Sequence, residues 1–318
     1  MSAPRLGRGA LLVLTAISLA GCAVTPAGSA WPSIDPSGLQ VVVVSTSTWT
    51  GAATVLVALE EADGRPVVPP AQVSIRLVGP NGTPTIEIQG DSVRPLGGRR
   101  DLIRASADLP FAGRWELTVR AVDRSAKTIL LVRDPAGVPV RGDKAPSVAT
   151  PTAVEVRYDL TRLTADPHPN PDFYRWSVAD ALAAHVPFAL VLDSAGFRET
   201  PACGAALSTL HRLAGEAPSV AIIHAEPYAT RIEADRLALD PPSGPARLAP
   251  WSEAWGLASD GHGTASIPWV FVVDASGRVR ATFQGIIGSE EVGLALGEVA
   301  GGQLNGGVAS TGAPSWTG

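Results

Sequence analysis

The sequence is poor in cysteine and in lysine, and both shortages exclude classes of protein. Only Cys22 and Cys203 occur in 318 residues, which is too few for a framework of internal disulfides. Lysine occurs only at Lys127 and Lys144, and the net charge is −5. This charge balance does not indicate the basic surface that nucleic-acid binding requires. We therefore expect no nucleic-acid partner.

Long apolar runs are also lacking, and the run nearest the N-terminus is short. Arg5 and Arg8 precede the uncharged stretch ALLVLTAISLA at positions 10–20. This length suits the hydrophobic region of a secretion signal, and it is too short to span a bilayer. The pattern predicts a signal peptide over residues 1–21.

The residues around the expected cleavage point carry a second signal. Leu19-Ala20-Gly21-Cys22 resembles the bacterial lipobox, in which the chain is cut before the cysteine. The resemblance implies that the sulfur of Cys22 carries a diacylglycerol and that acyl chains anchor the protein at the extracytoplasmic face of the cell membrane. The alternative is a signal cut elsewhere that leaves Cys22 free. With Cys22 lipidated, Cys203 is the one remaining thiol, and any disulfide needs an outside partner.

Composition and hydrophobic period divide the remainder of the chain. A hydrophobic content of 45% in 318 residues is enough for a large core and for more than one domain. Stretches rich in proline, glycine, serine and alanine separate segments of regular period. We predict a tether over 22–38, a β domain over 39–134, a linker over 135–158, an α/β domain over 159–300 and a disordered tail over 301–318.

The first ordered domain has the period of β-strands. Seven short runs from LQVVVV to AKTILLV are separated by turn signals such as Asp63-Gly64 and Gly97-Gly98. This spacing predicts an all-β sandwich. The stretch LPFAGRWELTVRAV resembles the late hairpin of immunoglobulin-like modules, with Trp115, Leu117 and Val119 pointing inward. We interpret the domain as an immunoglobulin-like spacer or adhesion module.

The second domain alternates between helices and buried strands. Ser177 is a candidate N-cap for a helix that ends near His185, and the apolar run PFALVLD follows as a strand. The same reasoning predicts a helix over 204–214, strands over 219–223, 269–274 and 278–283, and a helix over 290–299. The order is β-α-β followed by β-β-α, which predicts a mixed α/β sheet with helices on both faces.

This order of elements resembles the thioredoxin-like fold. Cys203 stands at the start of the helix after the first buried strand, and Ile267-Pro268 directly precedes the later hairpin. The stretches HPNPDFY, WGL and IPWVFVVDASGRV are similar to a group of bacterial thioredoxin-like proteins. The resemblance implies a cis-proline opposite the cysteine, and it implies that Ile267, Pro268 and Trp269 bind an incoming peptide.

The redox motif departs from the thioredoxin pattern. Thioredoxins carry Cys-Gly-Pro-Cys, whereas this chain has Cys203 followed by Gly204, Ala205 and Ala206, so the resolving cysteine is missing. Arg198 occupies the position of an upstream cysteine in the similar proteins. Thr200 suits the N-cap of the helix, which would place Cys203 where unpaired N–H groups and a cation such as Arg198 favour a thiolate.

Three interpretations of this site remain open. Cys203 can be the nucleophile of a monothiol that reacts with envelope thiols or disulfides, with Thr200 and Arg198 assisting it. It can be a buried small hydrophobic residue in a redox-inactive binding module. The sequence Thr200-Pro201-Ala202-Cys203 also resembles the Thr-x-x-Cys core of peroxiredoxins, although Gly196 stands where those proteins carry a proline.

The histidines do not form a recognisable metal motif. They are scattered through the second domain and its loops, as His168, His185, His211, His224 and His262. A single thiol with scattered imidazoles makes a poor soft-metal site. We expect no metal and no cofactor.

Overall fold

The computed structural model describes residues 38–82, 84–135, 137–197, 204–244, 246–257 and 267–301. The chain divides into residues 1–30 and residues 31–318, and all described residues belong to the second unit. The predicted signal peptide and, apart from Gly301, the predicted tail lie outside the described residues. So do Cys22, Arg198, Thr200 and Cys203.

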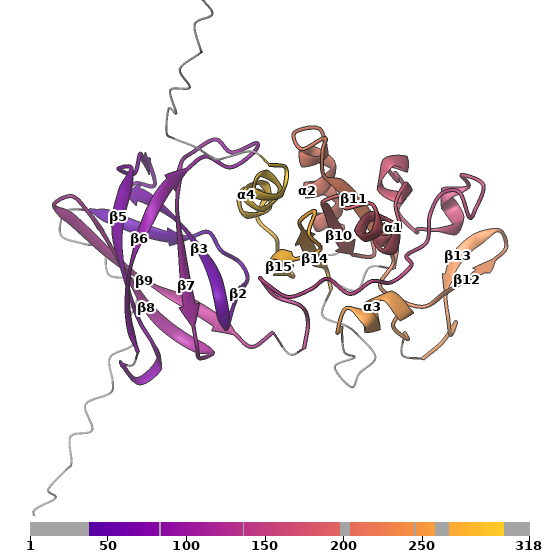
Figure 1. Ribbon diagram of the computed structural model, residues 1–318, viewed down its shortest axis with the longest axis horizontal. Coiled ribbons are helices and arrows are strands. Elements are labelled where there is room, and N and C mark those ends of the chain that lie inside the picture. The colour runs from indigo at the N-terminus through magenta and orange to yellow at the C-terminus, as the bar shows by residue number, and fades with distance from the viewer. Residues whose placement is uncertain are drawn as a thin grey trace, which may run out of the picture. The chain divides into compact units, whose positions relative to one another are not determined.

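The N-terminal part of the described chain is a β-rich domain. Its strands are β1 (Leu39–Val43), β2 (Thr48–Trp49), β3 (Gly51–Glu61), β4 (Pro66–Val67), β5 (Gln72–Val78), β6 (Thr85–Val93), β7 (Leu102–Leu109), β8 (Gly113–Ala121) and β9 (Arg124–Arg133). They are hydrogen-bonded in the order β1-β3-β7-β6-β5-β8-β9-β2, with β4 on β3. Figure 1 shows the strands wrapped around a shared interior. The mostly-β architecture agrees with the predicted sandwich.

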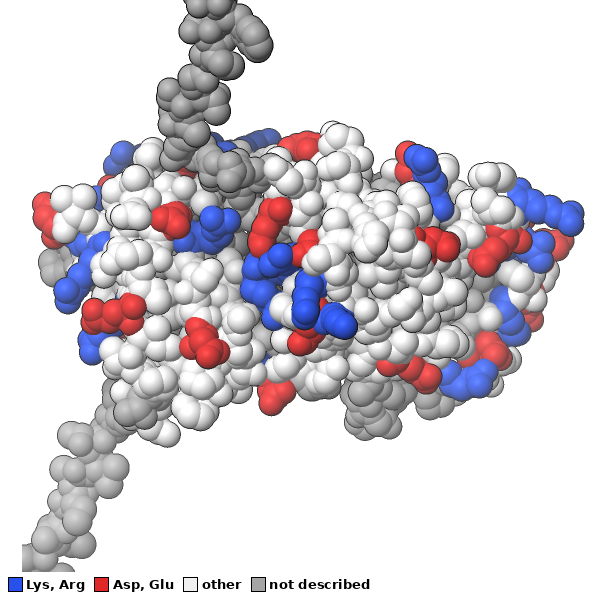
Figure 2. Space-filling model, in the orientation of Figure 1, with Lys and Arg blue, Asp and Glu red and all other residues white. Residues whose placement is uncertain are grey.

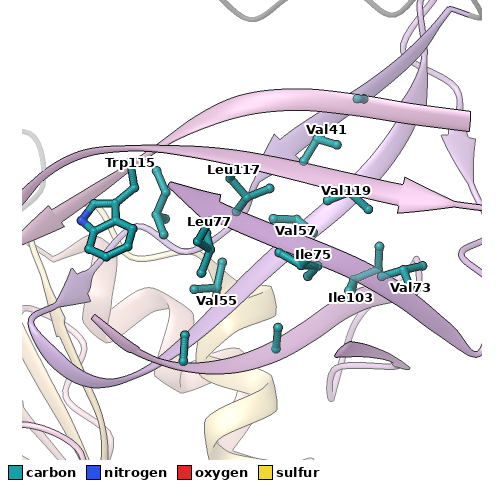
Figure 3. Close-up of a cluster of buried hydrophobic side chains, with 14 of the residues drawn as sticks. Val41, Val55, Val57, Val73, Ile75, Leu77, Ile103, Trp115, Leu117 and Val119 are labelled. Atoms are coloured by element: carbon teal, nitrogen blue, oxygen red, sulfur yellow. The ribbon is translucent and has the colours of Figure 1, made fainter. Parts of the chain in front are cut away.

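One hydrophobic core fills this interior. Alternate residues of β1, β3, β5, β7, β8 and β9 contribute to a single buried cluster, as the period of two requires. Figure 3 shows side chains of several strands converging on it. The predicted inward positions Trp115, Leu117 and Val119 are all fully buried, which confirms that prediction. The Trp115 indole nitrogen donates to the Phe111 carbonyl oxygen at 3.0 Å, so the buried ring keeps its polar atom satisfied.

The C-terminal part contains a mixed sheet of parallel and antiparallel strands with helices packed on it. Its strands are β10 (Phe188–Leu192), β11 (Ala221–Ala225), β14 (Trp269–Val273) and β15 (Val279–Gln284), in the order β11-β10-β14-β15. Strands β10 and β11 are parallel, and the pairs β10/β14 and β14/β15 are antiparallel. The helices are α1 (Val178–Ala183), α2 (Ala205–Ala214), α3 (Pro250–Ala254) and α4 (Ser289–Val299), with 3-10 turns at Leu160–Arg162 and Pro171–Tyr174. A further 3-10 turn, Pro80–Gly82, lies between β5 and β6 of the β-rich domain. None of the described helices is long and apolar enough to cross a membrane.

Helices cover both faces of this sheet. Helices α2 and α4 pack on one face through Leu207, Leu210 and Leu296. Helix α1 packs on the other face through Val178 and Ala181. The hydroxyl of Ser177 accepts a hydrogen bond from the Asp180 N–H at 3.1 Å, which confirms Ser177 as the N-cap of α1.

A hairpin that the sequence did not reveal follows β11. Its strands are β12 (Thr230–Glu233) and β13 (Arg236–Leu239). Ala234 and Asp235 connect them with φ values of 48° and 59°. A two-residue turn with positive φ at both positions is the connection that suits a tight hairpin.

The predicted linker lies along the edge strand β15. The Gly142 N–H donates to the Val279 carbonyl oxygen at 2.9 Å, and the Val279 N–H donates to the Asp143 carbonyl oxygen at 3.0 Å. The indole nitrogen of Trp49, from β2, donates to the Thr282 carbonyl oxygen at 2.8 Å. These contacts satisfy backbone groups of β15 that an open sheet edge would leave unpaired.

Helix α4 packs against the sheet of the β-rich domain and against the sheet of the C-terminal part. Leu294 belongs to a cluster with Leu56, Ala58 and Leu102 on the outer face of the β-rich domain. Val292 and its neighbours face the core of the α/β sheet instead. The helix is therefore buried on two sides.

A buried carboxylate fixes the first turn of α4. Glu291 accepts hydrogen bonds from the Thr46 N–H at 2.9 Å, from the Thr46 hydroxyl and from the Gly288 N–H at 3.0 Å. Burial raises the pKa of Glu291, and these donors oppose the rise. The side chain joins the loop after β1 to the start of α4.

Candidate functional site

The candidate site lies where β10 ends, β14 begins and α2 begins. Because β14 runs antiparallel to β10, the first residue of β14, Trp269, pairs with the last residue of β10, Leu192. The preceding Ile267–Pro268 peptide bond is cis. Asp193 follows Leu192 directly, so the backbone places this carboxylate at the same edge of the sheet as the proline.

Asp193 connects the strand end to the start of α2. Its carboxylate is fully buried, and its two oxygens accept from the Ser194 N–H at 2.8 Å and from the Gly204 N–H at 2.9 Å. Gly204 is the residue before α2 and has a φ of 82°, a left-handed conformation in which glycine avoids the strain of a side chain. The carboxylate thus binds the amide that follows Cys203 in the chain.

His224 holds the same strand end from the neighbouring strand β11. Its Nε2 atom lies 3.0 Å from the Asp193 carbonyl oxygen, which can only accept, so Nε2 carries the proton. In the neutral ring Nδ1 is then an acceptor, and the Tyr174 hydroxyl donates to it at 2.6 Å. Both rings are buried. In a neutral ring these two contacts therefore select the tautomer that carries its proton on Nε2.

Glu226 is a further buried acid in this region. Its Oε1 accepts from the Thr164 hydroxyl at 3.0 Å and from the Ala165 N–H at 2.9 Å. Its Oε2 is buried and has no hydrogen-bond partner among the described residues. The Trp251 indole nitrogen donates to the Glu226 carbonyl oxygen at 2.7 Å. Buried carboxylates are uncommon in soluble domains unless they are paired. Burial of the Glu226 side chain with one oxygen unpartnered among the described residues therefore costs folding free energy.

Burial changes the acidity of two of these groups. It raises the pKa of Asp193, and the nearby His224 ring and the backbone N–H donors counteract that change. It also raises the pKa of the Tyr174 hydroxyl, which therefore stays protonated and keeps donating at neutral pH. A carboxylate with a raised pKa is a stronger base than an ordinary aspartate, which is the direction that general base catalysis requires.

The three residues predicted to bind a peptide, Ile267, Pro268 and Trp269, differ in their contacts. The Pro268 carbonyl oxygen accepts from the Gly285 N–H at 2.9 Å, whereas no other described residue hydrogen-bonds to the Ile267 backbone. The Trp269 ring points into the core, where it stacks on Phe271 at 5.8 Å and on Trp49 at 5.7 Å between ring centroids. Ile267 and Trp269 are both buried. The structure brings Ile267 and Pro268 to the site edge and turns Trp269 inward.

The other predicted catalytic residues, Cys203, Thr200 and Arg198, lie outside the described residues. The sequence analysis did not single out Asp193, Tyr174 or Glu226 as site residues. Asp193 had a usable signal, because an acid ends the otherwise apolar run PFALVLD. Within the described ranges no group of three histidine, cysteine or acidic side chains could hold a metal ion.

Charged side chains outside the site are mixed in sign. Figure 2 shows basic and acidic residues interspersed over the visible face. Arg100 illustrates the pattern, since its guanidinium pairs with Glu60 at 2.6 Å and with Glu290 at 3.0 Å. Pairing of this kind leaves no large area of one sign on that face.

Comparisons with known proteins do not assign a family. No family model matches the chain, and no curated protein matches it. Among solved structures, the chain is similar to the native conformation of alpha-2-macroglobulin from E. coli, at 13% identity and a TM-score of 0.23. The match covers 81% of this chain and 14% of that protein, so the chain spans a small part of its length.

We predict that Tyr174→Phe destabilises the protein by about 1–3 kcal/mol, because the buried Nδ1 of His224 would lose its donor. Urea unfolding measures the change. The control is Tyr158→Phe, since Tyr158 is 72% exposed and its hydroxyl can bond to water. A loss of stability that is equal in the two variants would contradict the assigned hydrogen bond.

We also predict that the stability of the wild type, measured relative to Asp193→Asn, falls as the pH rises from 3 to 7 (about the range over which an Asp with a raised pKa titrates). The folded-state pKa of Asp193 is raised, so the folded protein holds the proton more tightly than the unfolded chain. The contribution is complete below the unfolded pKa and is lost as the pH rises through the folded pKa. Urea unfolding of both proteins across this range measures it, and a relative gain with rising pH would show the opposite shift.

Proposed function

We propose that the chain is a lipid-anchored, extracytoplasmic protein in which residues 159–300 form a thioredoxin-like domain with a single reactive thiol, Cys203. Its partners would be thiols or disulfides of other envelope proteins. The β-α-β and β-β-α order in one mixed sheet supports the fold, because it is the order by which the sequence resembles thioredoxin-like proteins. The cis peptide bond at Ile267–Pro268 agrees with the same resemblance.

One observation carries the functional part of the proposal. The buried carboxylate of Asp193 accepts from the amide of Gly204, the residue that follows Cys203, at the sheet edge where Ile267–Pro268 also lies. A thiol must lose its proton before it attacks a disulfide. A carboxyl with a raised pKa, connected to the start of the same helix, is suited to take that proton.

The proposed reaction stops at a covalent intermediate. The Cys203 thiolate would attack one sulfur of a partner disulfide, form a mixed disulfide and release the other partner sulfur as a thiolate. Electrons balance, because the partner disulfide is reduced as the new disulfide forms. Release then requires a second thiol from outside, since Ala206 stands at the resolving position and is buried in α2.

The unpaired backbone of Ile267 supports a role in peptide recognition. Its N–H and carbonyl are not hydrogen-bonded by any described residue, and an extended peptide could bond to them as an added strand. The β-rich domain would act as an immunoglobulin-like module that presents this site away from the membrane. The lipid on Cys22 would hold the whole chain at the cell surface.

A redox-inactive binding module is the second candidate function. Ala206 favours it, because a small apolar side chain replaces the second redox thiol and packs in the core. In that case partners would bind to the Ile267 backbone without a covalent step. The two candidates differ in one measurable property, the reactivity of Cys203 in the folded protein.

We predict that non-reducing gels of envelope extracts contain higher-mass adducts of the wild-type protein. They should disappear with reductant and in Cys203→Ser, and Ala206→Cys should diminish them by restoring an internal release step. Alkylation of the purified protein at a mildly acidic pH provides an independent measure, because a free thiol of pKa ~8.5 reacts slowly there. Absence of adducts together with slow alkylation favours the binding module, and formation of a sulfenic acid with peroxide favours peroxiredoxin-like chemistry.

We predict separately that Cys22→Ser abolishes acylation while the described domains still fold. The variant should leave the detergent phase in a phase-partitioning assay, whereas Cys203→Ser should remain in it. If Cys22→Ser partitions like the wild type, the lipid anchor is wrong while the proposal for Cys203 stands.

A further inference from the structure

A cavity of about 70 Å³ lies between the outer face of β3, the strand β15 and helix α4. Its walls are largely apolar, with Trp49, Leu56, Phe283 and Leu294 among them. A cavity of this size exceeds the room that one water needs, so it could admit a small organic molecule. None of its lining residues belongs to the polar cluster around Asp193.

An unpartnered hydroxyl lies at this cavity. Thr48 lines it and is 3% exposed, and its Oγ1 has no hydrogen-bond partner among the described residues. A buried hydroxyl without a partner costs folding energy. A ligand oxygen next to it would remove that cost.

One arginine of the cavity has no ion-pair partner among the described residues. Glu291 also lines the cavity, and its carboxylate accepts from the N–H groups of Thr46 and Gly288. Of its three arginines, Arg141 forms a two-pronged ion pair with Glu298 at 2.9 and 3.0 Å, and Arg280 pairs with Asp274 at 2.6 Å. Arg104 is half-buried and has no ion pair or hydrogen bond to another described residue. Asp91 lies opposite Arg104 in the register of β6 and β7, yet it makes no ion pair with it.

Arg104 also borders an open, polar hollow of about 510 Å³. The hollow and the apolar cavity share Thr54, Arg104, Arg141 and Glu298. The shared residues place Arg104 at the boundary between the polar hollow and the more apolar cavity.

We propose that this cavity binds a small monocarboxylic acid with a short aliphatic chain. The carboxylate would accept two hydrogen bonds from the Arg104 guanidinium, a geometry that the planar group favours. The chain would pack against Leu56, Phe283 and Leu294, and the Thr48 hydroxyl would donate to a ligand oxygen. A single guanidinium without an ion-pair partner matches a monoanion better than a dianionic phosphate. The site is independent of the proposed thiol chemistry.

Saturation-transfer NMR on the full chain, titrated at constant ionic strength, tests the site with butyrate as the probe. We expect saturable binding of butyrate and no comparable binding of butanol, which has a similar chain and no charge. Arg104→Gln should weaken butyrate binding about tenfold or more, because a charge-assisted pair is lost. Arg120→Gln is the matched control, since Arg120 is an exposed arginine of the same β-rich domain and should bind like the wild type.

Thr48→Val keeps the shape of the side chain and removes only the hydroxyl. It should weaken butyrate binding about two- to tenfold, as expected for a neutral hydrogen bond. The proposal is overturned if butanol or inorganic phosphate binds as well as butyrate, if Arg104→Gln binds butyrate like Arg120→Gln, or if butyrate gives no saturable signal in the millimolar range. The butyrate and butanol comparison decides the question even if a variant fails to fold.

Discussion

The burial of helix α4 on two sides is the constraint on which much of the described structure depends. One side packs Leu294 against the outer face of the β-rich domain, and the other packs Val292 and Leu296 into the core of the α/β sheet. Full burial of each such side chain is worth about 1.5–3 kcal/mol. Gly293 of α4 lies so close to the backbone of Leu96 that an added Cβ would stand 2.4 Å from the Leu96 carbonyl oxygen. The helix therefore has no room for a larger residue at this contact.

Two buried carboxylates, those of Glu291 and Asp193, each bind a backbone amide of another segment of the chain. Glu291 accepts from Thr46, and Asp193 accepts from Gly204. A buried ion without partners would be too costly to keep, so such side chains persist where hydrogen bonds compensate for lost hydration. The two acids thus specify how a loop and a helix start are placed, a task that apolar packing performs less selectively.

Local patterns predicted most elements, because period and capping act over a few residues. The apolar run before Asp193 and the cap at Ser177 are signals of this kind, and both elements form where expected. The hairpin of β12 and β13 escaped, since its turn residues, Ala234 and Asp235, lack the glycine that usually marks positive φ. The β-rich sheet was foreseen as alternating strands, yet the order in which strands pair is set by contacts between distant residues.

Site residues could be predicted from the sequence only where they directly adjoin a predicted strand. Ile267-Pro268 could be located because it directly precedes a strand. The pair formed by Tyr174 and His224 could not, since fifty residues separate them and neither has a periodic signal. The same holds for Thr164 and Glu226, whose hydrogen bond joins a loop to the end of β11.

The contact between Trp49 and Trp269 changes how the β-rich domain can be understood. A spacer needs only to hold its cargo at a distance, and its side chains need not enter the cargo's core. Trp49 instead stacks on Trp269, the residue that follows Pro268, and its indole bonds to β15. Because the ring of Trp269 lies in this core and its backbone pairs with β10 and β15, the backbone of Ile267 is the part of this segment that would bond to an incoming peptide under the proposed function. Recognition at Ile267–Pro268 would then depend on main-chain hydrogen bonds, whose alignment is set by a tryptophan from the other domain.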